Sequence, residues 1–193
     1  MKGELAAMKL KYKNIILRDM EEKDLDDYIR WNTTETEWQN WDAPWEVDKC
    51  TPFTEQVVFA KRLVNNYLVP DDPDNIRKRF EICTEDGTHI GWINRYCIDE
   101  NYSWSRTGTN IAIGIDIPSP NFRGHGCGEN AIRCFMQYLF DNGFDTLYTQ
   151  TWSGNDRMIH LAKKLGFREC DRKSNIRIVN GKTYDAVTFK IEK

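Results

Sequence analysis

The sequence predicts one α+β domain, over residues 1–193, built on a largely antiparallel sheet. Helical and strand-like segments follow one another without a repeat or a linker rich in Pro, Gly or Ser. Two pairs, Asp86-Gly87 and Asn180-Gly181, predict tight hairpin turns. Because 40% of the residues are hydrophobic, a chain of this length can bury its own core. We expect a mixed sheet of about six or seven strands with about four helices.

The first part of the chain is expected to fold as a strand followed by two helices. Residues 14–18 read as a short strand, and Leu25, Tyr28 and Ile29 follow at helical spacing. A second helix is predicted over residues 53–68, because apolar residues repeat there at intervals of three and four and Pro70 lies just beyond. Between these helices, residues 38–45 form an aromatic segment that fits no regular pattern.

The middle of the chain is predicted to be a run of strands. Residues 79–84 and 89–98 flank the Asp-Gly turn and form a hairpin. Residues 110–117 then place isoleucine at every odd position, whereas Ala112, Gly114 and Asp116 occupy the opposite face. This third segment is therefore a strand with one fully apolar face.

The last third of the chain is expected to alternate helices with strands. Helices are predicted over residues 129–142 and 155–165, each followed by a glycine, with a strand over 145–151 between them. Strands over 175–179 and 183–191 pair across the Asn-Gly turn.

Composition excludes several classes of protein. No apolar run approaches the roughly 18 residues of a membrane span, and the acidic Glu4 stands where a signal peptide would be apolar, so we expect a cytoplasmic protein. The six cysteines are scattered and form no C-x-x-C pair, which favours reduced thiols. His89, His125 and His160 lie far apart without nearby ligands, so we expect no metal. No basic stripe alternates with aromatic residues, which argues against nucleic-acid binding.

The net charge of −3 conceals two oppositely charged segments. Residues 19–48 hold eleven acidic and two basic side chains, whereas residues 157–177 hold seven basic and two acidic ones. Either segment could be a solvated helix face or part of a binding surface.

A glycine-rich segment, residues 123–128, lies between the isoleucine-rich strand and the next helix. Three of the twelve glycines fall within it. Glycine lets successive backbone N–H groups point into one concavity, and the following helix adds its positive N-terminal dipole, so the loop suits a phosphate. A plain tight turn is the alternative. The P-loop requires Gly-Lys-Ser/Thr, which is absent, and a dinucleotide-binding fingerprint requires an N-terminal βαβ unit.

Two blocks resemble the GNAT family of N-acetyltransferases. The acyl-CoA motif Q/R-x-x-G-x-G/A is matched by Arg123, Gly126 and Gly128. Residues 155–167 look like the segment N-x-x-A-x-x-L-x-x-K-L-G-F of that family. The opening at residues 15–19 resembles the Rim-type branch, which acetylates the N-termini of ribosomal proteins.

The resemblance implies acetyl-CoA as co-substrate and a slot between two splayed central strands that receives its pantetheine arm. It assigns residues 124–129 to the pyrophosphate through backbone N–H groups, Asn155 to the pantetheine arm and residues 116–118 to the thioester end. Arg123 could pair with a phosphate or form a surface salt bridge. The predicted cofactor-binding residues are Ile117, Pro118, Arg123, Gly124, His125, Gly126, Cys127, Gly128, Glu129 and Asn155.

The sequence departs from the family at positions that move protons. Ala162 stands where many members carry a tyrosine that protonates the leaving thiolate, and Gln150 where others carry a glutamate base. Pro118 also lacks the N–H that is usual at its position. Asp116 is the candidate base, with a capping role as the alternative. Ser153 is a second catalytic candidate that could relay a proton, as could Tyr148, although either fits a polar strand end equally well.

The acidic aromatic segment is the candidate acceptor site, because the resemblance places the region between the first two helices at the acceptor wall. Carboxylates beside tryptophans suit a cationic or amine-bearing acceptor, although the rings could simply anchor a loop. The candidate residues are Glu35, Glu37, Trp38, Trp41 and Asp42. We therefore expect an acetyl-CoA-dependent N-acetyltransferase acting on a protein N-terminus or a small cationic amine, with a non-catalytic acyl-CoA-binding module as the alternative. A homodimer is left open.

Overall fold

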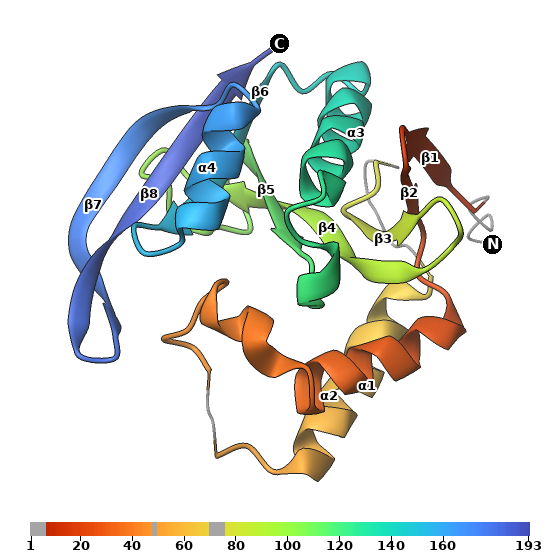
Figure 1. The fold of residues 1–193 in the computed structure, drawn as a ribbon. Coiled ribbons are helices and arrows are strands. Elements are labelled where there is room, and N and C mark those ends of the chain that lie inside the picture. Colours follow the sequence, from red (N-terminus) through yellow and green to blue (C-terminus); the bar gives the residue numbers. More distant parts are fainter. Residues whose placement is uncertain (1–6, 48–49, 70–75) are drawn as a thin grey trace.

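The computed structural model describes residues 7–47, 50–69 and 76–193. The described residues form an α+β fold around one mixed sheet of eight strands, in the order β1-β2-β3-β4-β5-β6-β8-β7 (Figure 1). The strands are β1 Lys9–Tyr12, β2 Ile15–Arg18, β3 Arg79–Thr84, β4 His89–Ile98, β5 Asn110–Asp116, β6 Thr146–Trp152, β7 Arg168–Val179 and β8 Lys182–Glu192. The α-helices are α1 Leu25–Thr33, α2 Phe53–Tyr67, α3 Cys127–Asp141 and α4 Asp156–Lys164.

The predicted splay of the central strands is present between β5 and β6. Neighbouring strands are antiparallel throughout the sheet except for this pair, which is parallel. β5 and β6 pair only from Ile111 to Ile113, opposite Leu147 to Thr149. Beyond these residues β5 continues to Asp116 and β6 to Trp152 without pairing to each other. One edge of β5 is therefore left without a neighbouring strand next to the loop that leads to α3.

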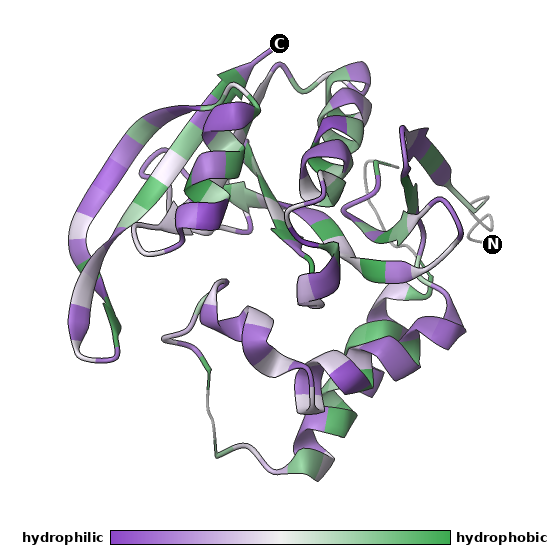
Figure 2. Ribbon diagram, in the orientation of Figure 1, coloured by the Kyte–Doolittle hydropathy of each residue, from purple (hydrophilic) through white to green (hydrophobic). Residues whose placement is uncertain are grey.

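The helices cover the two faces of the sheet. The isoleucine face of β5 packs against α3, where Ile113, Ala131 and Phe135 belong to one buried cluster. α1 and α2 cover the opposite face, where Tyr28 and Trp92 form a second cluster. Hydrophobic and hydrophilic residues alternate along α3 and α4 as expected for helices with one buried face (Figure 2). None of the described helices combines the length and apolar character that a bilayer span needs.

A network of buried charges joins α1 to the β3–β4 hairpin. The imidazole of His89 lies 2.8 Å from the carboxylate of Asp27 through Nδ1 and 3.0 Å from that of Glu81 through Nε2. Glu81 also accepts hydrogen bonds from Tyr28, at 2.6 Å, and from Arg79, at 2.9 Å. Burial opposes protonation of His89, but the carboxylates outweigh burial and raise its pKa to about 9. The imidazole is thus a buried cation at neutral pH.

The structure confirms the predicted fold class and differs from the predicted elements in three places. β1 is an additional strand that pairs with β2. β7 begins at Arg168, earlier than predicted, and its register with β8 shifts at two points. Part of the unassigned aromatic segment is a 3₁₀-helix, Thr36–Asn40. Three residues used in the sequence arguments, Glu4, Asp48 and Pro70, lie outside the described residues.

Candidate active site

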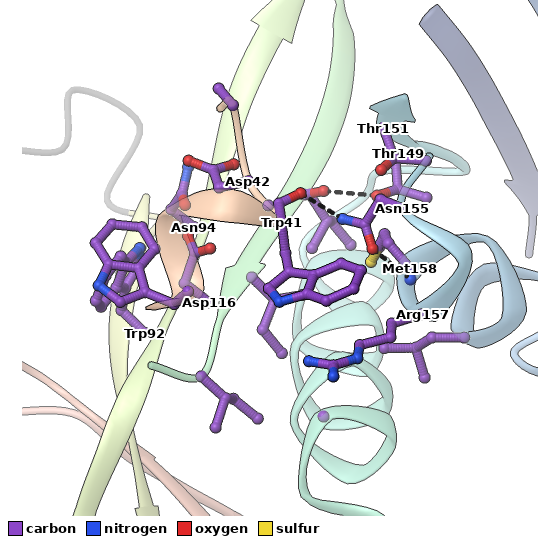
Figure 3. A pocket seen from close by; sticks show the side chains of 18 of the residues that line it. Trp41, Asp42, Trp92, Asn94, Asp116, Thr149, Thr151, Asn155, Arg157 and Met158 are labelled. Atoms are coloured by element: carbon purple, nitrogen blue, oxygen red, sulfur yellow. Dashed lines mark hydrogen bonds between the residues drawn. The ribbon is translucent and has the colours of Figure 1, made fainter. Parts of the chain in front are cut away.

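A pocket of about 1170 Å³ opens where β5 and β6 splay apart. Two groups of residues line it (Figure 3). The glycine half, around the start of α3 and α4, is lined by Gly124, Gly126, Gly128, Asn155, Leu161 and Lys164. The acidic half, between the sheet and the α1–α2 region, is lined by Trp38, Asp42, Phe59, Trp92, Asn94, Tyr96, Trp104 and Asp116.

The glycine half presents the beginning of α3 to the pocket. Gly124 and Gly126 adopt positive φ angles of 80° and 81°, which an L side chain rarely adopts, and α3 begins directly after them. Gly128 lies beside α4, where a Cβ would meet Leu161 at 3.5 Å, an ordinary contact distance. The first N–H groups of a helix have no acceptor within it. The loop can therefore donate several hydrogen bonds to an anion.

Side chains of the predicted loop take different places. Cys127 is buried in the core, so only its backbone is available, whereas His125 is exposed. The carboxylate of Glu129 pairs with Lys164 at 2.7 Å and Arg133 at 3.1 Å. These two partners lower the pKa of Glu129 and balance its charge at the start of α3.

Arg123 forms the salt bridge that was one of its two predicted roles. Its Nε donates to the carbonyl of Ile117 at 2.7 Å, and the guanidinium also donates to the carbonyl of Pro118. The same guanidinium pairs with Glu37. Arg123 therefore holds the turn that leaves β5 and ties it to the segment after α1.

Asn155 connects α4 to the aromatic segment. Its Oδ1 accepts from the backbone N–H of Met158 at 3.0 Å and so caps α4, while its Nδ2 donates to the carbonyl of Trp41 at 2.6 Å. The indole of Trp152 donates to the same carbonyl at 3.0 Å. The Trp41 ring lies 4.0 Å from the guanidinium of Arg157 and separates the two halves of the pocket (Figure 3). Both ends of the Asn155 amide are thus engaged within the protein.

Three carboxyl groups, those of Asp116, Asp42 and Glu46, face the acidic half. Asp116 ends β5 and accepts a hydrogen bond from the indole of Trp92, its neighbour in register on β4. Asp42 follows Trp41 and is exposed to the pocket (Figure 3). Desolvation, followed by the charge of Asp42, raises the pKa of Asp116 well above its ordinary value. Desolvation and the nearby Glu46 likewise raise the pKa of Asp42.

One face of β4 supplies pocket residues that the sequence argument missed. Trp92, Asn94 and Tyr96 line the pocket at alternate positions of the strand. Gly114 gives them room across β5, because a Cβ there would lie 3.2 Å from Asn94 and 3.6 Å from Tyr96. The hydroxyl of Tyr96 donates to Gln150 at 3.3 Å. The period-two spacing of these side chains was the signal that could have identified them.

Other predicted residues lie apart from the pocket lining. Glu35 pairs with Arg30 at 2.9 Å, and Glu37 accepts from the indole of Trp41 at 2.6 Å. The hydroxyl of Ser153 accepts from the backbone of Asp185 on β8 at 2.9 Å. The neighbouring residues Thr149, Gln150 and Thr151 line the pocket instead.

Two of the positions that depart from the family pattern, Ala162 and Gln150, have structural roles. Ala162 lies on the buried face of α4 and is fully enclosed in the core. Gln150 donates to the carbonyl of Tyr102 at 2.7 Å and to Thr188 at 3.1 Å. Among the described residues, Asp24, Asp27 and His89 form one group that could hold a metal ion, but both imidazole nitrogens already face carboxylates. The absence of a metal stays a prediction.

A family model described as "Acetyltransferase (GNAT) domain" matches residues 14–168. The chain belongs to the GNAT acetyltransferase family. This match confirms the resemblance that the sequence motifs predicted. A separate search of curated protein sequences finds no match.

Solved structures of other acetyltransferases share this fold. A GNAT-family acetyltransferase from Bacillus anthracis superimposes with a TM-score of 0.70 and 14% identity, covering 96% of this chain and 98% of its own. Spermidine N-acetyltransferase from Vibrio cholerae, in complex with CoA and spermine, superimposes with a TM-score of 0.67 and 19% identity, covering 93% of this chain and 96% of its own. Ribosomal-protein-S5-alanine acetyltransferase from Vibrio fischeri superimposes with a TM-score of 0.69 and 15% identity, covering 96% of this chain and 96% of its own. Ribosomal-protein acetyltransferases are thus among the structural neighbours, in agreement with the predicted Rim-type resemblance.

Proposed function

We propose that this protein transfers the acetyl group of acetyl-CoA to a primary amine by direct attack of the amine on the thioester. The observation that carries the proposal is the splay beyond Ile113, with the glycine loop beside it and Asp116 at the end of β5. Family membership supports acetyl-CoA as donor. At least three structural neighbours, the spermidine N-acetyltransferase among them, were solved with CoA or acetyl-CoA.

The residues present fit a CoA molecule. The first turn of α3, approached through Gly124 and Gly126, offers backbone N–H groups to a pyrophosphate. The edge of β5 beyond Ile113 has no partner on β6, so its backbone groups can pair with an extended arm that carries amide groups. When bound, acetyl-CoA supplies the activated acetyl group. The Asn155 amide keeps a second N–H that its bond to the carbonyl of Trp41 does not use.

Asp116 is the group that takes a proton from the acceptor amine. The amine must lose a proton to attack, and a carboxylate with a raised pKa is a better base at neutral pH than an ordinary aspartate. Ala162 cannot donate a proton, and the amide of Gln150 does not titrate. Most of the rate acceleration then comes from holding the amine and the thioester in the reactive orientation.

The decisive experiment measures thiol release from acetyl-CoA with a panel of primary amines, alongside acetyl-CoA binding. Asp116→Asn should lower turnover by ~10²- to 10⁴-fold, because a general base is lost. Asp26→Asn is the matched control, since Asp26 is exposed on α1. Acetyl-CoA binding without thiol release for any amine would contradict the proposal. That result would favour a non-catalytic acyl-CoA-binding module, the alternative that Ala162 and Gln150 support.

A further inference from the structure

Among the described residues, the acidic side chains that follow α1 fall into two sets: those paired with arginines and those without a cationic partner. Glu35 and Glu37 lie outside the pocket lining, and each pairs with an arginine: Glu35 with Arg30, and Glu37 with Arg123, which does line the pocket. Asp42 and Glu46 line the pocket, and within the described part of the chain neither has a cationic partner. The charge that faces the acidic half therefore comes from Asp42, Glu46 and Asp116, not from the segment as a whole.

The cations nearest to Asp116 are already neutralised. Arg79 donates to Glu81 at 2.9 Å and lies 5.1 Å from the Trp92 ring. Arg123 pairs with Glu37 and with two backbone carbonyls. Both arginines lower the pKa of Asp116, but Arg79 is paired with Glu81 and Arg123 with Glu37. The acidic half thus keeps an excess of negative charge.

Asp42 and Asp116 approach the same space from opposite walls. Asp42 comes from the segment after α1 and Asp116 from β5, and Figure 3 shows both beside Asn94. Two carboxylates in one partly desolvated pocket repel each other. An ammonium group between them would remove this repulsion and gain two charge-assisted hydrogen bonds.

Aromatic and aliphatic side chains also line the acidic half. Trp38 and Trp92 meet edge to face at 5.2 Å, and Leu63 lies on α2 beside them in the lining. Two lining residues are unusually open to solvent: Phe59 is 54% exposed and Trp104 is 65% exposed. A ligand that covers these rings removes apolar surface from water, which is favourable.

We infer that the acceptor is a primary amine carried by an apolar group, which binds with its ammonium between Asp42 and Asp116 and its apolar part against Phe59 and Trp104. This inference rests on the proposed acetyl transfer. Arylalkylamines and peptides with an apolar first residue share this chemistry, and the assay below distinguishes them.

The two carboxylates have separate tasks in this arrangement. Asp42 holds the ammonium, and Asp116 takes its first proton, which frees the nitrogen lone pair. The nitrogen then forms a bond to the acetyl carbon as the carbon–sulfur bond breaks, and its second proton passes to the leaving sulfur. The products are the N-acetylated amine and free CoA thiol.

The charge contact is tested with 2-phenylethylamine and with the amide of the tripeptide Phe-Gly-Gly. Losing a hydrogen bond to a charged group typically costs ~1.5–3 kcal/mol, so Asp42→Asn should raise KM for these acceptors ~10- to 100-fold. Because the charge of Asp42 also raises the pKa of Asp116, kcat should fall as well, but by a smaller factor than KM rises, and acetyl-CoA affinity should stay unchanged. Glu22→Gln, on an exposed residue of the same acidic segment, is the matched control.

The apolar contact is tested with acceptors of different polarity. Phe59→Ser should lower kcat/KM for 2-phenylethylamine ~10-fold, because it removes the exposed ring surface that this acceptor would cover. It should leave kcat/KM for ethanolamine nearly unchanged. Whichever apolar acceptor has the higher kcat/KM identifies the source of the amine. The inference is overturned if ethanolamine or 1,4-diaminobutane is acetylated as efficiently as both apolar acceptors, or if Asp42→Asn behaves like Glu22→Gln. Failure of every amine to release thiol overturns the proposed function itself.

Discussion

The buried imidazole of His89 should make the stability of this protein depend on pH in the alkaline range. His89 lies between Asp27 on α1 and Glu81 on β3, with Asp24 at 3.4 Å. Its pKa is about 9 in the folded chain, against a reference value of 6.5. A group whose pKa is raised by folding stabilises the protein fully below its unfolded pKa, and this stabilisation is lost as pH rises through the folded pKa.

The size of the effect follows from the difference between the two pKa values. Each pKa unit corresponds to about 1.4 kcal/mol, so the protonated imidazole contributes on the order of 3 kcal/mol below pH 6.5. Most of this contribution should disappear between pH 6.5 and pH 9. The side chain is 4% exposed, so bulk water screens the contact very little.

Urea unfolding at pH 6, 7, 8 and 9 measures this loss directly. The free energy of unfolding of the wild type should fall by ~3 kcal/mol more than that of His89→Gln over this range, because glutamine carries no titrating charge. His160→Gln, at an exposed histidine on α4, should reproduce the wild-type dependence. The reasoning is refuted if His89→Gln loses as much stability between pH 6 and 9 as the wild type does.

Three further predictions follow from other parts of the structure. CoA at a hundredfold excess over its Kd should stabilise the fold by ~2.7 kcal/mol, and Gly126→Val should abolish most of this gain because residue 126, within the glycine-rich loop, has a φ of 81°. An unchanged ligand-induced shift in Tm in this variant would contradict the prediction. Phe135→Ala should lower the free energy of unfolding by ~3–5 kcal/mol in urea titration, since its ring is fully buried, and a loss below 1 kcal/mol would contradict its place in the core. The rate of acetyl transfer should fall as pH drops through the raised pKa of Asp116, and Asp116→Asn should flatten this profile; an identical profile in the variant would remove Asp116 as base.

Much of the fold could be predicted because local signals agree with the tertiary structure. The turn at Asn180-Gly181 has φ angles of 49° and 75°, as the Asn-Gly pair requires for a tight hairpin, and β3 and β4 have the predicted bounds. β1 was missed because a four-residue edge strand carries little periodic signal. The early start of β7 was missed because its exposed, charged residues resemble a loop until β8 pairs with them.

The glycine loop could be located from the sequence, but the acidic half could not. The loop is contiguous, so its residues are recognised together. The acidic half is assembled from β4, β5, α2 and the segment after α1. Eleven acidic residues lie in the range 19–48, and the sequence does not show which of them form ion pairs. In the described part of the folded chain Glu35 and Glu37 pair with arginines, whereas Asp42 does not. Which carboxylates keep a free charge is a property of tertiary contacts.

The hydrogen bond from Asn155 to the carbonyl of Trp41 joins the two halves of the pocket mechanically. Asn155 caps α4 in the glycine half, and the next residue after Trp41 is Asp42 in the acidic half. A ligand that forms a hydrogen bond with the Asn155 amide therefore also affects the peptide unit that joins Trp41 to Asp42. Thermodynamic linkage makes such an effect reciprocal: the factor by which one substrate changes the affinity for the other is the same in both directions. Equilibrium binding of either substrate, measured with and without its partner, reports the same coupling free energy.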